Sequence, residues 1–585
     1  MEIKNLIIRD YLESLTEKNE LNRIFPILLE AMGFIILSKP SEYIGLLEYG
    51  KDIVAVGTLP GKKKCRFYFE LKGGNDRDIT EANFNGKDGI FDSIASAVSA
   101  NFSSAYPGYE NLPLQIIIVH NGIVKGNVQR KLEELLVNSS KLKKDLSFDR
   151  WDIYRLTELF AENLFGPHLL TDAESTRSFN RVLVNLNTGE HVLRDFSAII
   201  DNLLGKPVWG KGKKMPRLWQ VRFETLRLIA FIVYSEAKNN DNLEIAKKYL
   251  TFMVLHFWHW ILKQKLEGDR QTVSYFNKVF LLYFDVLSEY FRKTLPIAIL
   301  KDGLFSEHGG RYEQIGYTAR TQTYLQYLIF AIEAREFMSG RKDNEANRII
   351  TTVINNNDVS TRMLLDIHSL TIHSVMNYYI NDGRLVNAKN YLTLVLDNLA
   401  YAMDHDDFIP DANNSLDNVI KFITTGVKPV YYCSSTSLLL ASLLEYTAIL
   451  DMEEKFEKMK EIILEKDIEL GTFVPFHGKG IPAEKLIKDK DNDLEEILFS
   501  RSFTEGYQSQ LSLKKMFDKE LTFSEFKEKI RDRAKEFEYD YRTDAAGYPF
   551  LRKLAHIYFR TPFFPDDRRN IQIQDHGDAT ITVKS

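Results

Sequence analysis

The sequence has few cysteines, no long apolar run and no large excess of either charge. Two of the 585 residues are cysteines, Cys65 and Cys433, and they stand far apart. This scarcity excludes a disulfide scaffold and a cysteine-based zinc site, and it suits the reducing cytoplasm, where we place the protein. The net charge of −5 excludes a polycation, so any nucleic acid must bind through local basic patches.

The sequence also lacks a segment suited to crossing a membrane or directing export. The most apolar run, residues 249–262, is shorter than the roughly 20 residues that a membrane-spanning helix requires. The chain begins MEIKNLIIR, with an acidic residue at once and no long apolar stretch, unlike a signal peptide. We therefore expect no membrane partner.

The first 170 residues alternate between strand and helix patterns. A chain of this length exceeds one hydrophobic core, so we expect at least two domains. Residues 1–170 predict an α/β domain in which helices flank a mixed sheet. The predicted strands are 34–37, 53–56, 65–71, 114–119 and 151–154, and the predicted helices are 21–34, 90–102, 128–136 and 156–164.

Strand patterns disappear after about residue 190, and long helical patterns follow. We expect a linker at 171–195, a large all-α domain without a sheet at 196–560, and a polar tail at 561–585. Successive helices with short polar joints predict an α-solenoid of the tetratricopeptide type. The predicted helices are 218–237, 243–266, 274–295, 319–338, 359–379, 385–403, 437–450 and 453–464.

The residues that indicate chemistry lie between positions 48 and 74. Asp52 begins one predicted strand, while Glu70 and Lys72 lie two residues apart on the next, so their side chains share a face. Leu71 points into the core. Two converging carboxylates repel unless a cation lies between them, and oxygen ligands favour Mg²⁺ or Mn²⁺. The backbone carbonyl of Leu71 is a further possible ligand, and Lys72 would offset charge on a phosphate.

This arrangement resembles the PD-(D/E)XK signature of restriction-endonuclease-like nucleases. The order LNRIFPILLEAMGFIIL, GKDIVAV, YFELKGG and LQIIIVHNG is similar to Mrr-like nucleases and to the nuclease domains of bacterial anti-phage effectors. The resemblance covers about 165 residues and implies that Asp52 and Glu70 are metal ligands and that Lys72 is catalytic. The family's proline is absent, because Lys51 precedes Asp52.

The resemblance also implies an acid from the opening helix. Glu20 and Glu30 both qualify, and we favour Glu20 because it lies at the start of the helix. The alternative for Glu70 and Lys72 is a solvated strand edge, since an acid-x-lysine pair is common by chance. His120, within His-Asn-Gly, falls near the predicted site, although a strand-ending turn explains this tripeptide.

Two basic segments are candidate nucleic-acid contacts. Lys62, Lys63 and Lys64 would guide a phosphate backbone next to the site, or would form only a charged hairpin tip. Residues 205–217 contain Lys211, Lys213 and Lys214 near Trp209, an aromatic side chain able to stack on a base. A solvated interdomain loop explains this second segment equally well.

The sequence thus predicts a Mg²⁺-dependent endonuclease with DNA as favoured substrate and RNA left open. We expect the helical domain to bind a protein partner or to self-associate, in bacterial anti-phage defence. The alternatives are a catalytically inactive nuclease-fold binding module and a site-specific restriction endonuclease. The first 150 residues hold 20 basic and 20 acidic side chains, and the rest holds 56 basic against 61 acidic. This acidic balance favours protein contacts over extensive duplex contact.

Overall fold

The chain folds into two compact units. The computed structural model describes residues 3–15, 20–38, 52–86, 89–99, 102, 104–143, 145–165, 173–188, 193–209, 214–476, 507–512, 517–534 and 542–560. The first unit comprises residues 1–254 and 270–283, and the second comprises residues 255–269 and 284–585. Two long helices, α11 (Leu243–Lys263) and α12 (Arg270–Ala298), contribute residues to both units.

A five-stranded mixed sheet forms the centre of the first unit. Its strands lie in chain order: β1 pairs with β2 and β2 with β3 in antiparallel fashion, whereas β3 pairs with β4 and β4 with β5 in parallel. The predicted mixed sheet is therefore confirmed. The strands are β1 (Ile35–Ser38), β2 (Ile53–Gly57), β3 (Cys65–Lys72), β4 (Leu114–His120) and β5 (Leu146–Trp151).

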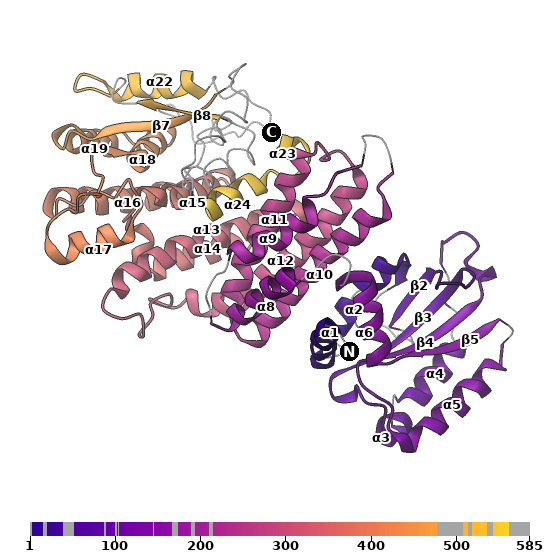
Figure 1. Cartoon of the computed structure of the whole chain (residues 1–585). Coiled ribbons are helices and arrows are strands. Elements are labelled where there is room, and N and C mark those ends of the chain that lie inside the picture. The colour runs from indigo at the N-terminus through magenta and orange to yellow at the C-terminus, as the bar shows by residue number, and fades with distance from the viewer. Residues whose placement is uncertain are drawn as a thin grey trace. The chain divides into compact units, whose positions relative to one another are not determined.

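Helices cover both faces of this sheet (Figure 1). Alternate residues of each strand point to opposite faces. On one face, Phe69 packs edge to face against Phe25 of α2. On the other face, Tyr68 joins a core that includes Ile94 and Ile116. The helices of the first face are α1 (Ile3–Ser14), α2 (Asn22–Met32) and α6 (Ile153–Phe160), and those of the second are α3 (Glu81–Asn85), α4 (Ile90–Ser99) and α5 (Gly126–Ser140).

The last strand lies earlier in the chain than predicted. The sequence predicts a strand at residues 151–154, but β5 ends at Trp151 and α6 begins at Ile153. The side chain of Asp152 accepts a hydrogen bond from the amide of Arg155, 3.1 Å away. This contact makes Asp152 the N-cap of α6, which prevents the strand from continuing.

Further helices complete the first unit. The segment predicted as a linker contains a helix, α8 (Ala173–Thr188). It is followed by α9 (Leu193–Leu204) and α10 (Arg217–Asn239), and α10 packs against α2 and α8. The sheet layer and these helices therefore belong to the same compact unit.

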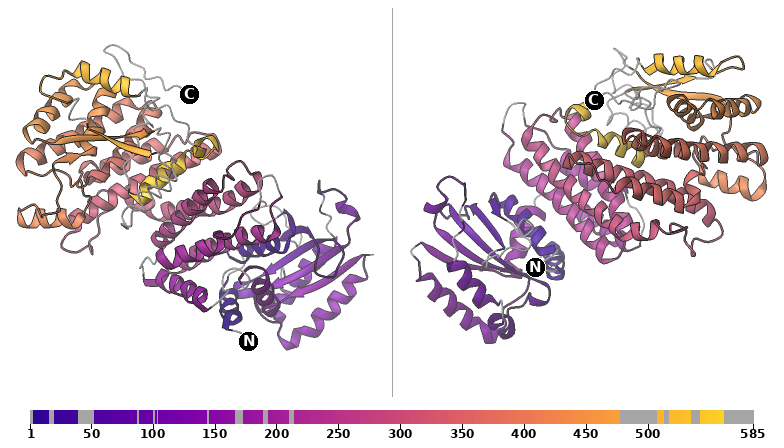
Figure 2. Two further views of the ribbon diagram at one scale, coloured as in Figure 1. Left: turned by 45° about the horizontal axis from the view of Figure 1, so that its top comes forward. Right: turned by 180° about the vertical axis from the view of Figure 1, so that it is seen from behind.

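The second unit is mostly helical, as predicted (Figures 1 and 2). A tetratricopeptide-like repeat stays a prediction, and the tail at 561–585 lies outside the described residues. Its remaining helices are α13 (Glu313–Ser339), α14 (Ala346–Asn356), α15 (Ser369–Asn381), α16 (Leu385–His405), α17 (Leu416–Thr425), α18 (Leu438–Ile449), α19 (Glu453–Glu465), α22 (Phe523–Ala534), α23 (Arg542–Ala545) and α24 (Phe550–Phe559).

The prediction that residues 196–560 contain no sheet is wrong. Three strands pair in the order β6 (Thr436–Ser437), β7 (Glu469–Phe476) and β8 (Tyr507–Ser512). The sequence of β7, ELGTFVPF, combines β-branched and aromatic residues with a glycine and a proline, which disfavour a helix. The β7 strand packs against α18.

One predicted helix of this unit begins ten residues later than expected. Residues 359–379 show a helical pattern, but α15 starts only at Ser369. Asp366 instead accepts hydrogen bonds from the hydroxyl of Ser437 and the amide of Leu438. The segment before α15 therefore forms short 3-10 turns. The carboxylate of Asp366, in this segment, accepts hydrogen bonds from free amides at the start of α18.

Candidate active site

The open end of the β2–β3 hairpin sets the two predicted acidic residues opposite each other. Ile53 of β2 is paired with Phe69 of β3, and the amide of Asp52 donates to the carbonyl of Phe69 at 2.9 Å. Asp52 therefore stands opposite Glu70, at the point where the antiparallel ladder ends. Glu70 and Lys72 are two residues apart on β3, so both side chains lie on one face.

Leu71 connects the two carboxylate positions through its backbone. Its amide donates a hydrogen bond to Oδ2 of Asp52, with a nitrogen-to-oxygen distance of 2.6 Å. In an antiparallel ladder, the N–H and C=O of one residue point to the same neighbouring strand. The carbonyl of Leu71 is therefore also directed toward the beginning of β2. The Leu71 side chain is fully buried on the opposite face, as predicted from the alternation of the strand.

Glu70 and Lys72 form a close ion pair with little solvent around it. Oε1 of Glu70 lies 2.9 Å from Nζ of Lys72, and the two side chains are 9% and 17% exposed. Ion pairs in full solvent are strongly screened, whereas this pair lies where the effective dielectric constant is lower. A ligand that binds beside this pair would therefore interact more strongly with each charge than it would in open water.

A buried histidine lies next to Lys72 on the neighbouring strand. His120 is the last residue of β4 and is paired in register with Lys72. The strand-ending turn that we expected therefore begins one residue later. Nδ1 of His120 lies 3.1 Å from the carbonyl oxygen of Arg77, which assigns the proton to Nδ1. Within the described residues, Nε2 of His120 is buried and has no hydrogen-bond partner.

Burial determines the charge of this histidine. The side chain of His120 is fully buried, and this burial lowers its pKa from 6.5 to about 4. His120 is therefore a neutral imidazole at neutral pH and adds no positive charge beside Lys72. The strand pattern placed this residue near the site, but its burial depends on contacts with distant segments.

The two acids proposed from the opening helix lie against α10. The carboxylate of Glu20 accepts a hydrogen bond from the hydroxyl of Ser235 at 2.6 Å. Glu30 pairs with Arg227 at 2.8 Å and with Lys278 at 2.9 Å. None of these contacts is with Asp52, Glu70 or Lys72. Arg227 and Lys278 also pair with Glu224, so these two cations balance Glu30 and Glu224 together.

The lysines of the β2–β3 turn lie away from the carboxylates, which corrects the prediction that they border the site. Lys62, Lys63 and Lys64 connect the end of β2 to the start of β3, whereas Glu70 lies six residues further along β3. At the rise of an extended strand, this separation is roughly 20 Å. Lys64 also donates a hydrogen bond to the hydroxyl of Tyr106.

The second basic segment is described in part. Lys211 and Lys213 lie outside the described residues, and Lys214 is exposed. The ring of Trp209 packs against that of Trp219, with 5.6 Å between the ring centroids. Because the Trp209 ring already has an aromatic neighbour, its use as a base-stacking platform would require a second accessible face.

The oxygen atoms at the hairpin end are of the kind that a hard divalent cation binds. They comprise the carboxylates of Asp52 and Glu70 and the carbonyl of Leu71. Within the described part of the chain, no group of three or more histidine, cysteine, aspartate or glutamate side chains is arranged to hold a metal. Mg²⁺ commonly uses one or two carboxylates and takes its other ligands from water and substrate phosphate. Asp52 and Glu70 are two carboxylates of this kind.

Comparisons with protein-family models, with curated proteins and with solved structures found no match to this chain. Among the helices of the described residues, none has the length and apolar character needed to span a bilayer.

Proposed function

We propose that the protein is a Mg²⁺-dependent nuclease that hydrolyses phosphodiester bonds, with DNA as the favoured substrate. One observation carries the proposal: at the open end of an antiparallel hairpin within a mixed sheet, the strand register sets Asp52 opposite Glu70, which pairs with Lys72. The choice of DNA rests on the resemblance to PD-(D/E)XK nucleases. The order of strands and helices around the hairpin agrees with that resemblance.

The carboxylates would supply the metal site. Asp52 and Glu70 would each contribute an oxygen, and Leu71 would contribute its carbonyl. Bound Mg²⁺ lowers the pKa of a coordinated water and stabilises negative charge on the phosphate. The hydrogen bond from Leu71 to Oδ2 of Asp52 orients this carboxylate before any ligand binds. Because this carboxylate is already oriented, less free energy is needed to reorganise it during the reaction.

Lys72 would act on the phosphate. Its ammonium pairs with Glu70, and its side chain is only 17% exposed, so solvent screens the charge weakly. Charge stabilisation is worth more in such surroundings than in open water. Lys72 would donate a hydrogen bond from Nζ to a phosphate oxygen or to the attacking water, and the proton would stay on Nζ.

The second unit would control this activity. An unregulated nuclease damages its own cell, so coupling to a helical unit that binds a partner or self-associates is physically reasonable. The resemblance to effector nucleases suggests bacterial anti-phage defence as the setting. The second unit holds 40 basic and 49 acidic side chains, and this acidic balance supports a protein as its partner.

A second candidate function is a catalytically inactive nuclease-fold module that acts as a scaffold. The direct ion pair between Glu70 and Lys72 favours it, because each group neutralises the other as in a purely structural pair. The two functions differ in what happens when one member of the pair is replaced. A catalytic pair loses activity, whereas a structural pair loses stability.

Cleavage assays on matched variants distinguish these functions. The wild type, Glu70→Gln and Lys72→Met would be incubated with plasmid DNA, linear DNA and RNA, in Mg²⁺, Mn²⁺ or a chelator. The controls are Glu81→Gln and Lys131→Met. These two residues form an exposed ion pair between α3 and α5, two helices that cover the sheet. We expect each site variant to lose roughly 100-fold or more in rate, because charge stabilisation at the phosphate is lost.

Melting curves complete the comparison. The site variants should melt within a few degrees of the wild type, and the control variants should cleave at the wild-type rate. Cleavage that persists in Glu70→Gln and Lys72→Met at the wild-type rate contradicts the proposal. A wild type that cleaves none of the three substrates in either cation supports the scaffold instead.

A further inference from the structure

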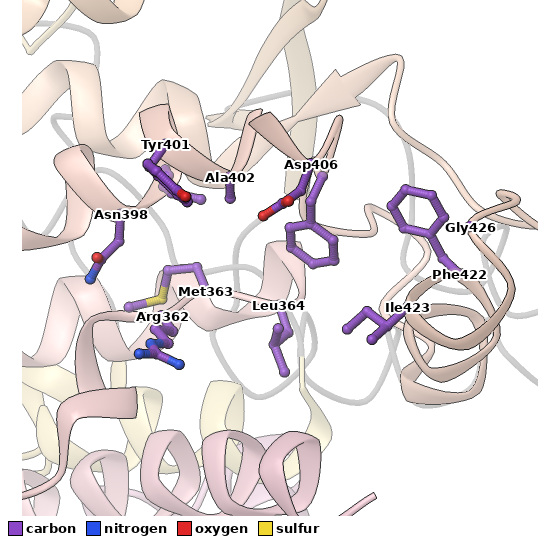
Figure 3. A pocket seen from close by; sticks show the side chains of 12 residues that line it. Arg362, Met363, Leu364, Asn398, Tyr401, Ala402, Asp406, Phe422, Ile423 and Gly426 are labelled. Atoms are coloured by element: carbon purple, nitrogen blue, oxygen red, sulfur yellow. The ribbon is translucent and has the colours of Figure 1, made fainter. Parts of the chain in front are cut away.

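The second unit contains a pocket of about 800 Å³ between α16, α17 and residues 362–364 (Figure 3). Leu364 and Phe422 supply apolar surface, whereas Arg362 and Asp406 bring opposite charges to the lining. A lining that combines apolar surface with both charges does not single out one class of ligand. The polar side chains at one end of the sheet in the first unit select a ligand more narrowly.

One face of this sheet is apolar along most of its length and becomes polar where the parallel strands end. The apolar side chains of this face pack in one hydrophobic cluster, which reaches Val54, Tyr68, Ile118 and Phe148. Alternate residues of a strand share a face. The next positions on this face, two residues further along each chain segment, are Asp52, Glu70, His120 and Arg150. Arg150 therefore shares this polar margin of the sheet with the candidate active site.

The strand register fixes the place of Arg150 relative to the carboxylates. Ile118 of β4 pairs with Glu70 on one side and with Arg150 on the other. At about 4.8 Å between neighbouring strands, the Cα atoms of Glu70 and Arg150 are roughly 10 Å apart. Both Arg150 and Lys72 have long cationic side chains. One extended polyanion that crosses the polar margin can thus contact both.

The guanidinium of Arg150 is only weakly paired within the described residues. Its Nη2 lies 3.6 Å from Oδ2 of Asp152, which is longer than a charge-assisted hydrogen bond. The other oxygen of Asp152 accepts a hydrogen bond from the amide of Arg155 at the start of α6. In the part of the chain that the structure describes, the buried Nε of Arg150 has no hydrogen-bond partner. The side chain is 29% exposed, so an anion can approach it from solvent.

His120 supplies an acceptor that matches the donor of Arg150. Because Nδ1 carries the proton, Nε2 can accept a hydrogen bond, and it is buried without a partner among the described residues. The two side chains are neighbours, since the positive charge of Arg150 adds to burial in lowering the pKa of His120. A hydrogen bond from Nε of Arg150 to Nε2 of His120 would satisfy both buried groups and leave the Nη donors for a ligand.

Arg66 is a second arginine on this face, at the opposite end of β3, and its charge is already paired. Its Nη1 lies 3.0 Å from a carboxylate oxygen of Glu110, and its guanidinium lies over the ring of Tyr109. Its Nε is buried without a hydrogen-bond partner in the described residues, as in Arg150. The two arginines therefore differ mainly in the close carboxylate that Arg66 has, which makes Arg66 the matched control.

We propose that Arg150 binds a phosphate of the nucleic-acid backbone next to the phosphate that is cleaved, and that His120 positions its guanidinium. This inference rests on the proposed nuclease function, which supplies the substrate. The planar guanidinium presents N–H donors in the geometry that phosphate oxygens accept. Lys72 would act at the cleaved phosphate and Arg150 at its neighbour, so the two cations would set the course of the strand along the polar margin.

Binding of a fluorescein-labelled DNA duplex to the full-length protein measures this contact without cleavage. Anisotropy titrations would be made in a chelator at several salt concentrations. We expect Arg150→Met to bind about tenfold more weakly than the wild type, because a charged hydrogen bond is lost. The slope of log affinity against log salt should fall by about one, which a purely structural role would not cause. Arg150→Lys keeps the charge and should keep this slope.

Two further variants test the positioning and the place of the contact. His120→Asn keeps a donor for the carbonyl of Arg77 and removes the acceptor Nε2. It should weaken binding by about threefold in the wild-type background and have no further effect in Arg150→Met, because the two groups act together. Arg66→Met should bind as the wild type does. Melting curves verify folding, and Arg150→Gln replaces Arg150→Met if the methionine variant is unstable.

Steady-state cleavage in Mg²⁺ separates the roles of the two cations. Arg150→Met should raise KM about tenfold and change kcat by less than about threefold, since the contact exists before and during the reaction. Lys72→Met should lower kcat instead.

The outcomes separate this inference from the nuclease proposal. A wild type that cleaves DNA, with unchanged affinity and salt slope in Arg150→Met, overturns the role of Arg150 alone. An equal loss of affinity in Arg66→Met and Arg150→Met overturns it as well. A wild type that binds DNA without cleaving it, with the expected loss in Arg150→Met, supports the phosphate contact and contradicts the nuclease. A wild type that neither binds nor cleaves contradicts both.

Discussion

Replacing His120 tests whether its burial imposes a pH dependence on the stability of the sheet layer. The substitution His120→Asn preserves a donor at the position of Nδ1, so the hydrogen bond to the carbonyl of Arg77 can remain. The asparagine does not titrate. The smaller side chain lowers the free energy of unfolding by the same amount at every pH. The contribution of the imidazole to this free energy, by contrast, varies with pH.

The size of the effect follows from the pKa of the buried imidazole. Burial lowers the pKa of His120 from 6.5 to about 4, so the unfolded chain binds a proton more readily than the folded chain. Stability must therefore rise with pH between about 4 and 6.5. At about 1.4 kcal/mol for each tenfold difference in proton affinity, the wild type loses about 3 kcal/mol between neutral pH and pH 4.

The measurement is equilibrium unfolding in urea at several pH values, for the wild type and His120→Asn. Pulse hydrogen exchange at one fixed pH, followed by mass spectrometry of peptides covering residues 114–120, would report on β4 alone. We expect the difference in unfolding free energy between the two proteins to change by about 3 kcal/mol over this pH range. Parallel pH profiles would refute the reasoning, because they would mean that His120 titrates alike in both states.

Three further predictions concern stability. Leu71→Ala should lower the free energy of unfolding by ~2–5 kcal/mol in urea, because a fully buried side chain is truncated; an unchanged urea midpoint would contradict its place in the core. Arg227→Met should cost about 1–3 kcal/mol, since Glu30 and Glu224 lose a shared cation, and adding Glu224→Gln should recover part of this loss. Asp152→Ala should cost about 1 kcal/mol in thermal unfolding by removing the N-cap of α6, and a stability equal to wild type would exclude that role.

Local patterns were sufficient to predict most of the sheet. The first four strands begin and end within one residue of their predicted limits, because β-branched and apolar runs between turn residues are local signals. The fifth strand is predicted too late in the chain because the sequence around Asp152 is compatible with a strand. Only the hydrogen bond from the amide of Arg155 shows that Asp152 is the N-cap of a helix. The strands β7 and β8 were missed because they pair across a long intervening segment within a helical surrounding.

The difference between local patterns and contacts with distant segments also applies to the candidate site. Asp52, Glu70 and Lys72 come together through one hairpin, so strand alternation alone predicted that they share a face. The role of Glu30 depended on Lys278, which is distant in sequence, and no local pattern indicates that contact. The burial of His120 likewise depends on segments that fold over the end of β4.

The ion pairs of Glu30 bear on how this protein can be divided or recombined. Glu30 belongs to a helix that covers the sheet, while Arg227 lies on α10 and Lys278 on α12. A fragment that ends near residue 170 would keep the anion and lose both cations, and it would uncover the face of α2 that packs against α10. The smallest piece expected to fold alone therefore extends well beyond the sheet. To transfer the candidate site to another protein, one would therefore have to include α2, α10 and α12 as well.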